Sequence, residues 1–137
     1  MRSFFGYLMV LLIAGVISSN THAQVPNPKL FVGIEVFFVS SDATKFGGCK
    51  AKFNVDFGAD PDIGVDSGGP CDREELSFGC DGTQGVTKAA GNQMYSSAQL
   101  AFAMGKQVNV RVNPAYVVNG ICVASRVDVT ANDATGF

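Results

Sequence analysis

The chain has 137 residues, a formal net charge of −2 and no tryptophan. That length suits one domain built around a single hydrophobic core. The slightly acidic balance offers no basic surface to neutralise phosphates, so nucleic acid is not an expected partner.

Residues 1–23 have the layout of a secretory signal peptide. Arg2 supplies a short positive start, an apolar run of 14 residues covers 4–17, and small residues precede the expected cut after Ala23. The run is shorter than the roughly 20 residues that cross a bilayer. We therefore expect a secreted or periplasmic domain, 24–137, with no membrane span and with nine basic against twelve acidic residues.

Two strands are expected first in this domain. The segment 29–41 is rich in β-branched and aromatic residues, and both of its faces are largely apolar. Its faces hold Leu30, Val32, Ile34, Val36 and Phe38 on one side, and Phe31, Glu35, Phe37 and Val39 on the other. Such a strand is covered on both sides in a small barrel, or forms a subunit interface where closure leaves it uncovered. The segment 49–57 alternates strictly, with the inward positions expected to be Cys49, Ala51, Phe53, Val55 and Phe57.

The middle of the chain combines a polar loop, a short strand and a helix. The loop 58–75 is dense in Gly, Pro and Asp, and a third strand is expected over 76–80. A helix follows from about 93 to 104 and ends at Gly105, where a left-handed residue is favoured. Its broad apolar face consists of Met94, Tyr95, Ala98, Ala101 and Phe102.

Two further strands complete the pattern. The segment 108–112 alternates, and Asn113-Pro114 interrupts it. Asn119-Gly120 is a hairpin signal, so 115–118 is expected to pair with a last strand over 121–129. The tail from about 130 to 137 is expected to be loose.

The order of these elements predicts a mainly β fold with one helix, β-β-β-α-β-β. This is the order of the OB-fold, a small Greek-key barrel whose helix closes one end. An open α+β sheet with the helix packed across one face is the alternative.

The four cysteines predict two disulfides, since an even number in an exported chain is normally paired. Three pairings are open to Cys49, Cys71, Cys80 and Cys122. The barrel brings the third and last strands together, which favours Cys80–Cys122 and leaves Cys49–Cys71 to close the acidic loop.

A resemblance supports this fold. The stretch 95–101 (YSSAQLA), the stretch 105–110 (GKQVNV) and a Cys in the last strand resemble the B subunits of subtilase-cytotoxin and pertussis-like toxins. They are also similar to small exported bacterial proteins with the same helix-Gly-strand-Cys ending. The resemblance covers about 93–128 and implies an OB barrel, a ring of five subunits and recognition of cell-surface glycans. The absence of Trp and the long loop 58–75 depart from that family.

Histidine chemistry is excluded from the mature domain, because the only histidine is His22 in the expected signal peptide. Ser-His-Asp and Cys-His catalysis and histidine-ligated metals therefore have no residues to use. Asp72, Glu74 and Glu75 are the nearest carboxylates for acid–base work, but they lie in a polar stretch that would not hold them. We expect a protein that is not an enzyme and needs no cofactor.

Binding sites are expected in the loops. Asp60, Asp62 and Asp66 could supply hard oxygens to calcium, although their spacing does not fit an EF-hand. Side chains suited to sugar hydroxyls occur around the first turn and after the fourth strand; these are Ser40, Ser41, Asp42, Thr44, Lys45, Asn113 and Tyr116.

Together these features predict an exported, non-enzymatic binding domain that recognises a glycan or protein ligand, with a homo-oligomer as the assembly that the resemblance implies. The alternative is a monomeric envelope protein with a structural or inhibitory role that binds calcium through the acidic loop.

Overall fold

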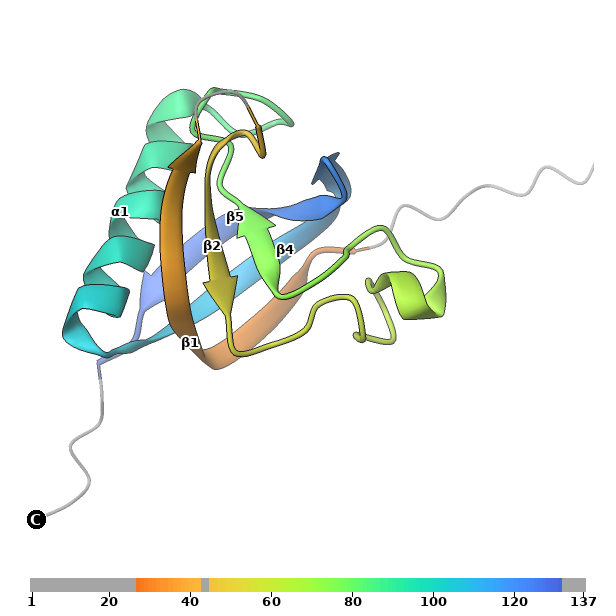
Figure 1. Ribbon diagram of the computed structural model, residues 1–137, viewed down its shortest axis with the longest axis horizontal. Helices are drawn as coiled ribbons and strands as arrows, with labels where there is room; N and C mark the ends of the chain where they lie inside the picture. Colours follow the sequence, from red (N-terminus) through yellow and green to blue (C-terminus); the bar gives the residue numbers. More distant parts are fainter. Residues whose placement is uncertain (1–26, 43–44, 132–137) are drawn as a thin grey trace, which may run out of the picture.

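The computed structural model describes residues 27–42 and 45–131 (Figure 1). The predicted signal peptide, Thr44 and all but the first two residues of the predicted loose tail lie outside the described residues. The described residues form strands β1 (Lys29–Asp42), β2 (Gly48–Phe53), β3 (Glu75–Ser77), β4 (Gln107–Val118) and β5 (Ile121–Val129), helix α1 (Lys88–Met104) and a short 3-10 helix (Val65–Ser67).

The five strands close into a barrel in the order β1-β2-β3-β5-β4, with β4 pairing back to β1. All pairs are antiparallel except β3 with β5, which run parallel and meet at Ser77 and Val123. Helix α1 connects β3 to β4 and packs mainly against β1 and β5. The predicted mainly β, OB-like barrel is therefore confirmed, and the open sheet is excluded.

Strand β1 changes partner along its length. Its first half, Lys29 to Glu35, pairs with β4, and its second half, Val36 to Asp42, pairs with β2. The ladder is irregular between Phe31 and Ile34 and again between Val36 and Phe38. Such bulges bend a strand and raise its twist, which a strand must do to close a small barrel.

These two bulges make the predicted alternation of β1 wrong at several positions. Ile34 and Val36 are buried, whereas the other large side chains expected on the same face are exposed; these are Leu30, Val32 and Phe38. Phe37 is also exposed, so two neighbouring phenylalanines face outward. Each bulge adds a residue, and one extra residue moves the following side chains to the other face.

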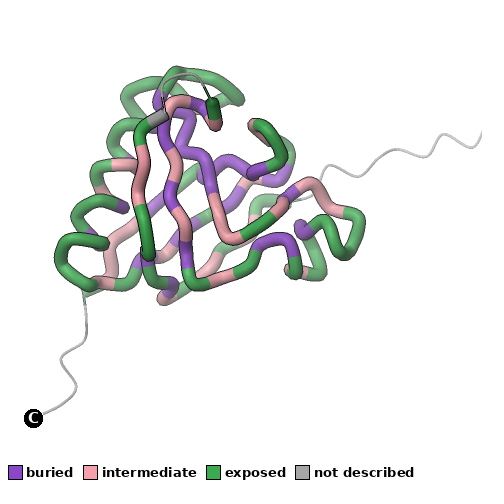
Figure 2. The backbone as a smooth tube through the Cα atoms, in the orientation of Figure 1, coloured by how far each residue is buried: buried purple, intermediate pink, exposed green. Residues whose placement is uncertain are grey.

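All five strands and α1 contribute buried residues to the barrel core (Figure 2). The inward residues predicted for β2 are buried over Cys49, Ala51 and Phe53, and Phe57 is buried just beyond the strand. Phe57 contacts Phe53 and Phe31 edge to face, with ring centroids 5.8 and 4.9 Å apart. These edge-to-face contacts join β1, β2 and the segment that follows β2 in one aromatic cluster.

Helix α1 begins five residues before its predicted start. Thr87 caps it, because its hydroxyl accepts a hydrogen bond from the Ala90 N–H at 3.2 Å. It ends where predicted: Gly105 has φ +61° and its N–H bonds to carbonyls of the last turn. Met94, Ala98 and Ala101 face the core, but Phe102, which was expected there, is 48% exposed.

Strand β4 is continuous through Asn113-Pro114, which was expected to interrupt it. The chain accommodates Pro114 in an irregular stretch of the β4–β5 ladder, between Asn113 and Val117, where the proline needs no ladder hydrogen bond. The Asn119-Gly120 hairpin is confirmed.

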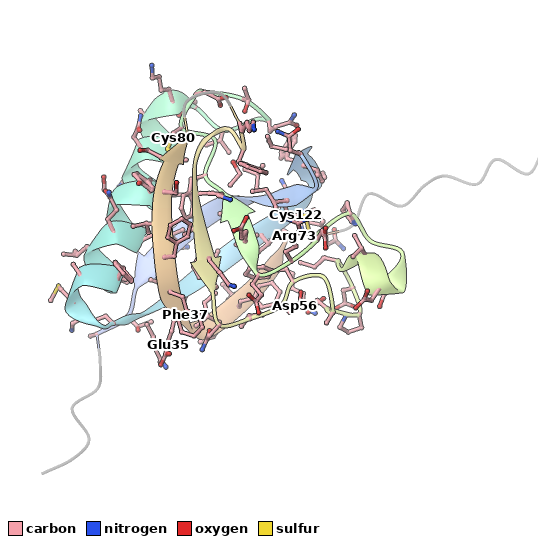
Figure 3. The ribbon with its side chains drawn as sticks, in the orientation of Figure 1. Glu35, Phe37, Asp56, Arg73, Cys80 and Cys122 are labelled. Atoms are coloured by element: carbon pink, nitrogen blue, oxygen red, sulfur yellow. A yellow bond between two sulfur atoms is a disulfide. The ribbon has the colours of Figure 1, made fainter. Side chains whose placement is uncertain are left out.

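Two disulfides are confirmed, but the expected pairing is wrong. Cys49 bonds to Cys80 and Cys71 bonds to Cys122, with Cα atoms 5.6 and 5.0 Å apart. Cys80 and Cys122 are labelled at separate places in Figure 3, Cys80 in the segment that leads to α1 and Cys122 near the start of β5.

Strand register explains this pairing. The antiparallel β2–β3 ladder brings Cys49 beside the end of β3, where its carbonyl accepts from Phe78 N–H at 3.2 Å. Cys71 precedes β3, and the Asp72 N–H donates to the Gly120 carbonyl at 3.1 Å. The Cys71–Cys122 bond thus ties the acidic loop to the β4–β5 hairpin.

Disulfides persist in non-reducing compartments, so the folded domain belongs in one. Within the described ranges, no helix has the length and apolar character required to cross a membrane.

Peptide mapping tests the disulfide pairing directly. Basic residues lie between all successive cysteines, so trypsin places each cysteine on its own peptide. Under non-reducing conditions we expect cross-linked peptides that join Cys49 to Cys80 and Cys71 to Cys122. A peptide that joins Cys49 to Cys71 would contradict the fold. Replacing Cys71 and Cys122 together by Ser should lower the free energy of unfolding by about 4 kcal/mol, since their bond closes a large loop.

Candidate functional site

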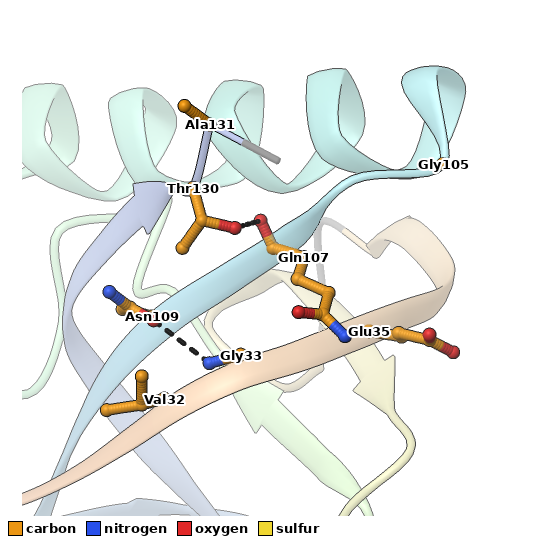
Figure 4. Close-up of a pocket in the computed structure, with 8 residues that line it drawn as sticks. All are labelled: Val32, Gly33, Glu35, Gly105, Gln107, Asn109, Thr130 and Ala131. Carbon is orange, nitrogen blue, oxygen red and sulfur yellow. Dashed lines mark hydrogen bonds between the residues drawn. The ribbon is translucent and has the colours of Figure 1, made fainter. Parts of the chain in front are cut away.

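A groove lies on the outside of the β1–β4 pair, and we call it the amide groove (Figure 4). It has a volume of about 660 Å³ and is open to solvent. It begins at the first bulge of β1 and ends where β5 leaves the sheet. Its lining consists of Val32, Gly33, Glu35, Gly105, Gln107, Asn109, Thr130 and Ala131.

Gly33 forms the floor of the groove. It has φ +66°, a conformation that L side chains rarely adopt. A Cβ at this position would lie 3.3 Å from Gln107 Oε1, so a side chain would crowd the groove as well as strain the backbone. A glycine in a bulge marks a place where a ligand or another group approaches the backbone closely.

Two carboxamides from alternate positions of β4 project over this floor. Asn109 Oδ1 accepts a hydrogen bond from the Gly33 N–H at 2.9 Å, which directs the Asn109 NH₂ group away from the bulge. The Gln107 side chain extends across β1 toward Glu35 (Figure 4). The groove therefore offers donors and acceptors whose positions the sheet fixes.

The far wall is held by the end of β5. Thr130 donates from its hydroxyl and from its backbone N–H to the Gln107 carbonyl, at 2.8 and 3.0 Å. The hydroxyl oxygen of Thr130 keeps its acceptor capacity. On the near side, the backbone N–H of Glu35 donates to Asn54 Oδ1 at 2.9 Å, which fixes the backbone that carries the exposed Glu35 carboxylate.

The chemistry of the groove suits an uncharged, hydroxyl-rich ligand. Carboxamides, a hydroxyl and one carboxylate can each exchange hydrogen bonds with sugar hydroxyls, and the exposed Val32 methyls can pack on a sugar face. Among the described residues that line the groove, Glu35 is the one that carries a charge.

Sequence reasoning missed this groove. Most of its polar residues lie on the outer faces of β1 and β4, whereas the alternation of apolar residues in these strands predicts only which side chains are buried. The signal that could have found it is Gly33, an isolated glycine within an apolar strand pattern, which suggests a bulge.

Two of the predicted ligand residues meet in a second, smaller pocket of about 240 Å³. Asn113 and Tyr116 line it together with Met94, Val123 and Ser125, at the N-terminal end of α1. Asn113 Oδ1 accepts from the Ala115 N–H at 3.1 Å, which leaves its NH₂ group available. No charged residue is among the described residues that line this pocket.

The other predicted ligand residues do not join them. Ser40, Ser41 and Asp42 form the end of β1 and pair with β2 residues Lys50, Cys49 and Gly48. Lys45 follows in the turn. The structure thus separates the described residues of this set into two places, the end of β1 with the turn after it and the Tyr116 pocket.

Two carboxylates of the acidic loop form ion pairs with a basic residue of β1. Lys29 Nζ lies 2.7 Å from carboxylate oxygens of both Asp60 and Asp62, so these two residues pin the loop to the start of β1. Asp66 lies apart in the 3-10 helix. Within the described residues, no cluster of three or more His, Cys, Asp or Glu side chains could hold a metal ion.

Three further carboxylates of this region also have basic neighbours. Glu74 pairs with Lys52 at 2.6 Å, and Glu75 pairs with Lys50 at 2.8 Å across the β2–β3 ladder. Asp72 lies 3.4 Å from the Arg73 guanidinium. In each of these ion pairs an acidic and a basic side chain neutralise each other.

The Lys29 ion pairs shift the pKa values of both partners. Partial burial pushes the Asp60 pKa upward, but hydrogen bonds from Lys29 and from backbone N–H groups outweigh it, so the pKa falls below its ordinary 3.8. Hydrogen bonds to Asp60 and Asp62 raise the pKa of Lys29 above its ordinary 10.5.

Comparisons of the chain with protein-family models, with curated proteins and with solved structures found no match.

The Lys29–Asp60 contact predicts a pH-dependent part of the stability. Because the folded pKa of Asp60 is lowered, its contribution is present above pH 3.8 and is lost as the pH falls through the folded value. The raised pKa of Lys29 gives a contribution that is present below pH 10.5 and is lost as the pH rises through the folded value.

We therefore expect Asp60→Asn to lower the free energy of unfolding by about 1 kcal/mol at neutral pH, and by less as the pH drops below 3.8. Urea titrations at several pH values measure this, with Asp66→Asn as the control on the same loop. Equal stability of Asp60→Asn and the wild type at neutral pH would contradict the assignment.

Proposed function

We propose that this chain is an exported, non-enzymatic binding domain that recognises a neutral glycan in the amide groove. The observation that carries this proposal is the pair of carboxamides over the Gly33 bulge. Asn109 is oriented by the backbone of β1, so its donors need no rearrangement before a ligand binds.

The fold is consistent with this role. Small barrels of this type hold ligands on their outer strand surfaces and in adjoining loops. The resemblance of 93–128 to toxin B subunits, which recognise glycans, points to the same class of ligand. Two disulfides support an exported protein, since paired cysteines are typical of oxidising compartments.

The charge of the groove favours a neutral ligand over an acidic one. Its one charged lining residue, Glu35, is negative, and the chain as a whole is acidic. An anionic sugar would meet repulsion there, whereas hydroxyl groups can donate to Glu35. Binding should therefore change little with salt.

The rival role, a monomeric structural or inhibitory envelope protein that binds calcium, stays a hypothesis. Two of the three carboxylates that it needs, on Asp60 and Asp62, are already engaged by Lys29.

The test is binding of the oxidised mature protein to an array of neutral glycans, followed by calorimetry with a soluble glycan that binds. We expect Asn109→Ala and Gln107→Ala each to weaken binding about tenfold, since one hydrogen bond contributes roughly 1 kcal/mol. Gly33→Ala should weaken it further, because its Cβ approaches the Gln107 amide.

Asn113→Ala is the matched control, because it removes the same side chain from the Tyr116 pocket and leaves the groove intact. If Asn113→Ala abolishes binding while Asn109→Ala does not, the Tyr116 pocket is the site. If no neutral glycan binds, or binding falls steeply with added salt, the proposal fails.

A further inference from the structure

The Tyr116 pocket, the hollow of about 240 Å³ beside the first turns of α1, combines an apolar floor with polar groups around it. Three buried residues form the floor: Met94, Val123 and Ala124. The pocket shares no lining residue with the amide groove. Whatever binds here therefore meets a different chemistry from that of the groove.

Tyr116 forms a wall of this pocket because β4 leaves its ladder there. The β4–β5 register jumps between Asn113 and Val117, so the residues 114–116 stand out of the ladder. The Tyr116 ring rests on the backbone of Gly85, which has φ +74° and where a Cβ would lie 2.7 Å from the Tyr116 Cζ atom. Any side chain there would displace the ring, so this wall of the pocket requires a glycine.

Two hydrogen-bond donors of the pocket are available to a ligand. Asn113 Oδ1 accepts from the Ala115 N–H, whereas the Asn113 NH₂ group and the Tyr116 hydroxyl bond to none of the described residues. The hydroxyl of Ser125, by contrast, already donates to the Arg111 carbonyl at 3.2 Å. A ligand that matches the pocket therefore brings a hydrogen-bond acceptor.

The size and charge of the pocket limit the ligand further. An apolar cavity of about 150 Å³ takes up benzene, and drug-sized ligands fill roughly 300 Å³ or more. A pocket of about 240 Å³ thus suits one ring with a few further atoms. None of the described residues that line it is charged, so a charged ligand would give up hydration without gaining an ionic partner.

Two of the lining side chains favour an aromatic ring over a saturated one. The Met94 thioether and the Tyr116 ring both interact with aromatic rings by more than the burial of apolar area alone. We propose that the Tyr116 pocket binds an uncharged aromatic molecule of one ring that carries a carbonyl acceptor. This site does not depend on the amide groove binding a glycan.

Titration of acetophenone into the oxidised mature protein, followed by ¹H–¹⁵N NMR and without glycan, tests this proposal. We expect saturable shifts of the backbone amides of Gly85, Thr87 and Ser125, with a Kd on the order of 1 mM for a ligand of this size. The amides of Gly33 and Asn109 in the amide groove should not shift. Cyclohexyl methyl ketone, the saturated counterpart, should bind about threefold more weakly.

A matched pair of variants on α1 locates the site. Ala90 lines the pocket, whereas its neighbour Ala89 does not, and both are exposed. Ala90→Leu should weaken acetophenone binding roughly tenfold or more, because the larger side chain occupies the space of the ring. Ala89→Leu should bind like the wild type. Asn113→Ala should weaken binding about fivefold, since it removes the donor to the carbonyl.

Three results would overturn the proposal. The first is a set of shifts that do not saturate by about 20 mM acetophenone, well above the Kd expected for this size, or that scatter over the whole surface. The second is equal binding to Ala90→Leu and Ala89→Leu. The third is a saturated ketone that binds as tightly as acetophenone, which would remove the aromatic class of ligand.

Discussion

Strand β1 is the element on which the rest of the structure depends, because it must pair with two different neighbours. Its first half pairs with β4 and closes the barrel, and its second half pairs with β2. A strand can serve both neighbours only if it bends, and each bend adds a residue to the ladder. The two bulges therefore follow from closure of the barrel.

The two bulges decide which parts of β1 face outward. The first puts Gly33 under the carboxamides of β4 and opens the amide groove, the site that we propose for a ligand. The second turns Phe37 outward, where it borders a small hollow with Ala101 and Gly105.

The disulfides and the Lys29 ion pairs hold the loops against the barrel. A small barrel with only three residues in β3 has little sheet to hold the segments around it. The Cys71–Cys122 bond and Lys29 fasten the acidic loop at two points, and the Cys49–Cys80 bond fastens the chain that leads into α1. The loop that suggested a calcium site is thus ordered by contacts within the protein.

The sequence by itself determined the order of elements, the end of α1 at Gly105 and the Asn119-Gly120 turn, and it favoured the barrel over an open sheet. These rest on local signals, since hydrophobic period, glycine and hairpin residues act over a few positions. Only the tertiary structure decided the cysteine pairing, the faces of β1 and the position of Asn109 over Gly33. Those depend on register between strands far apart in the chain, and a shift of one residue reverses which side chains face outward.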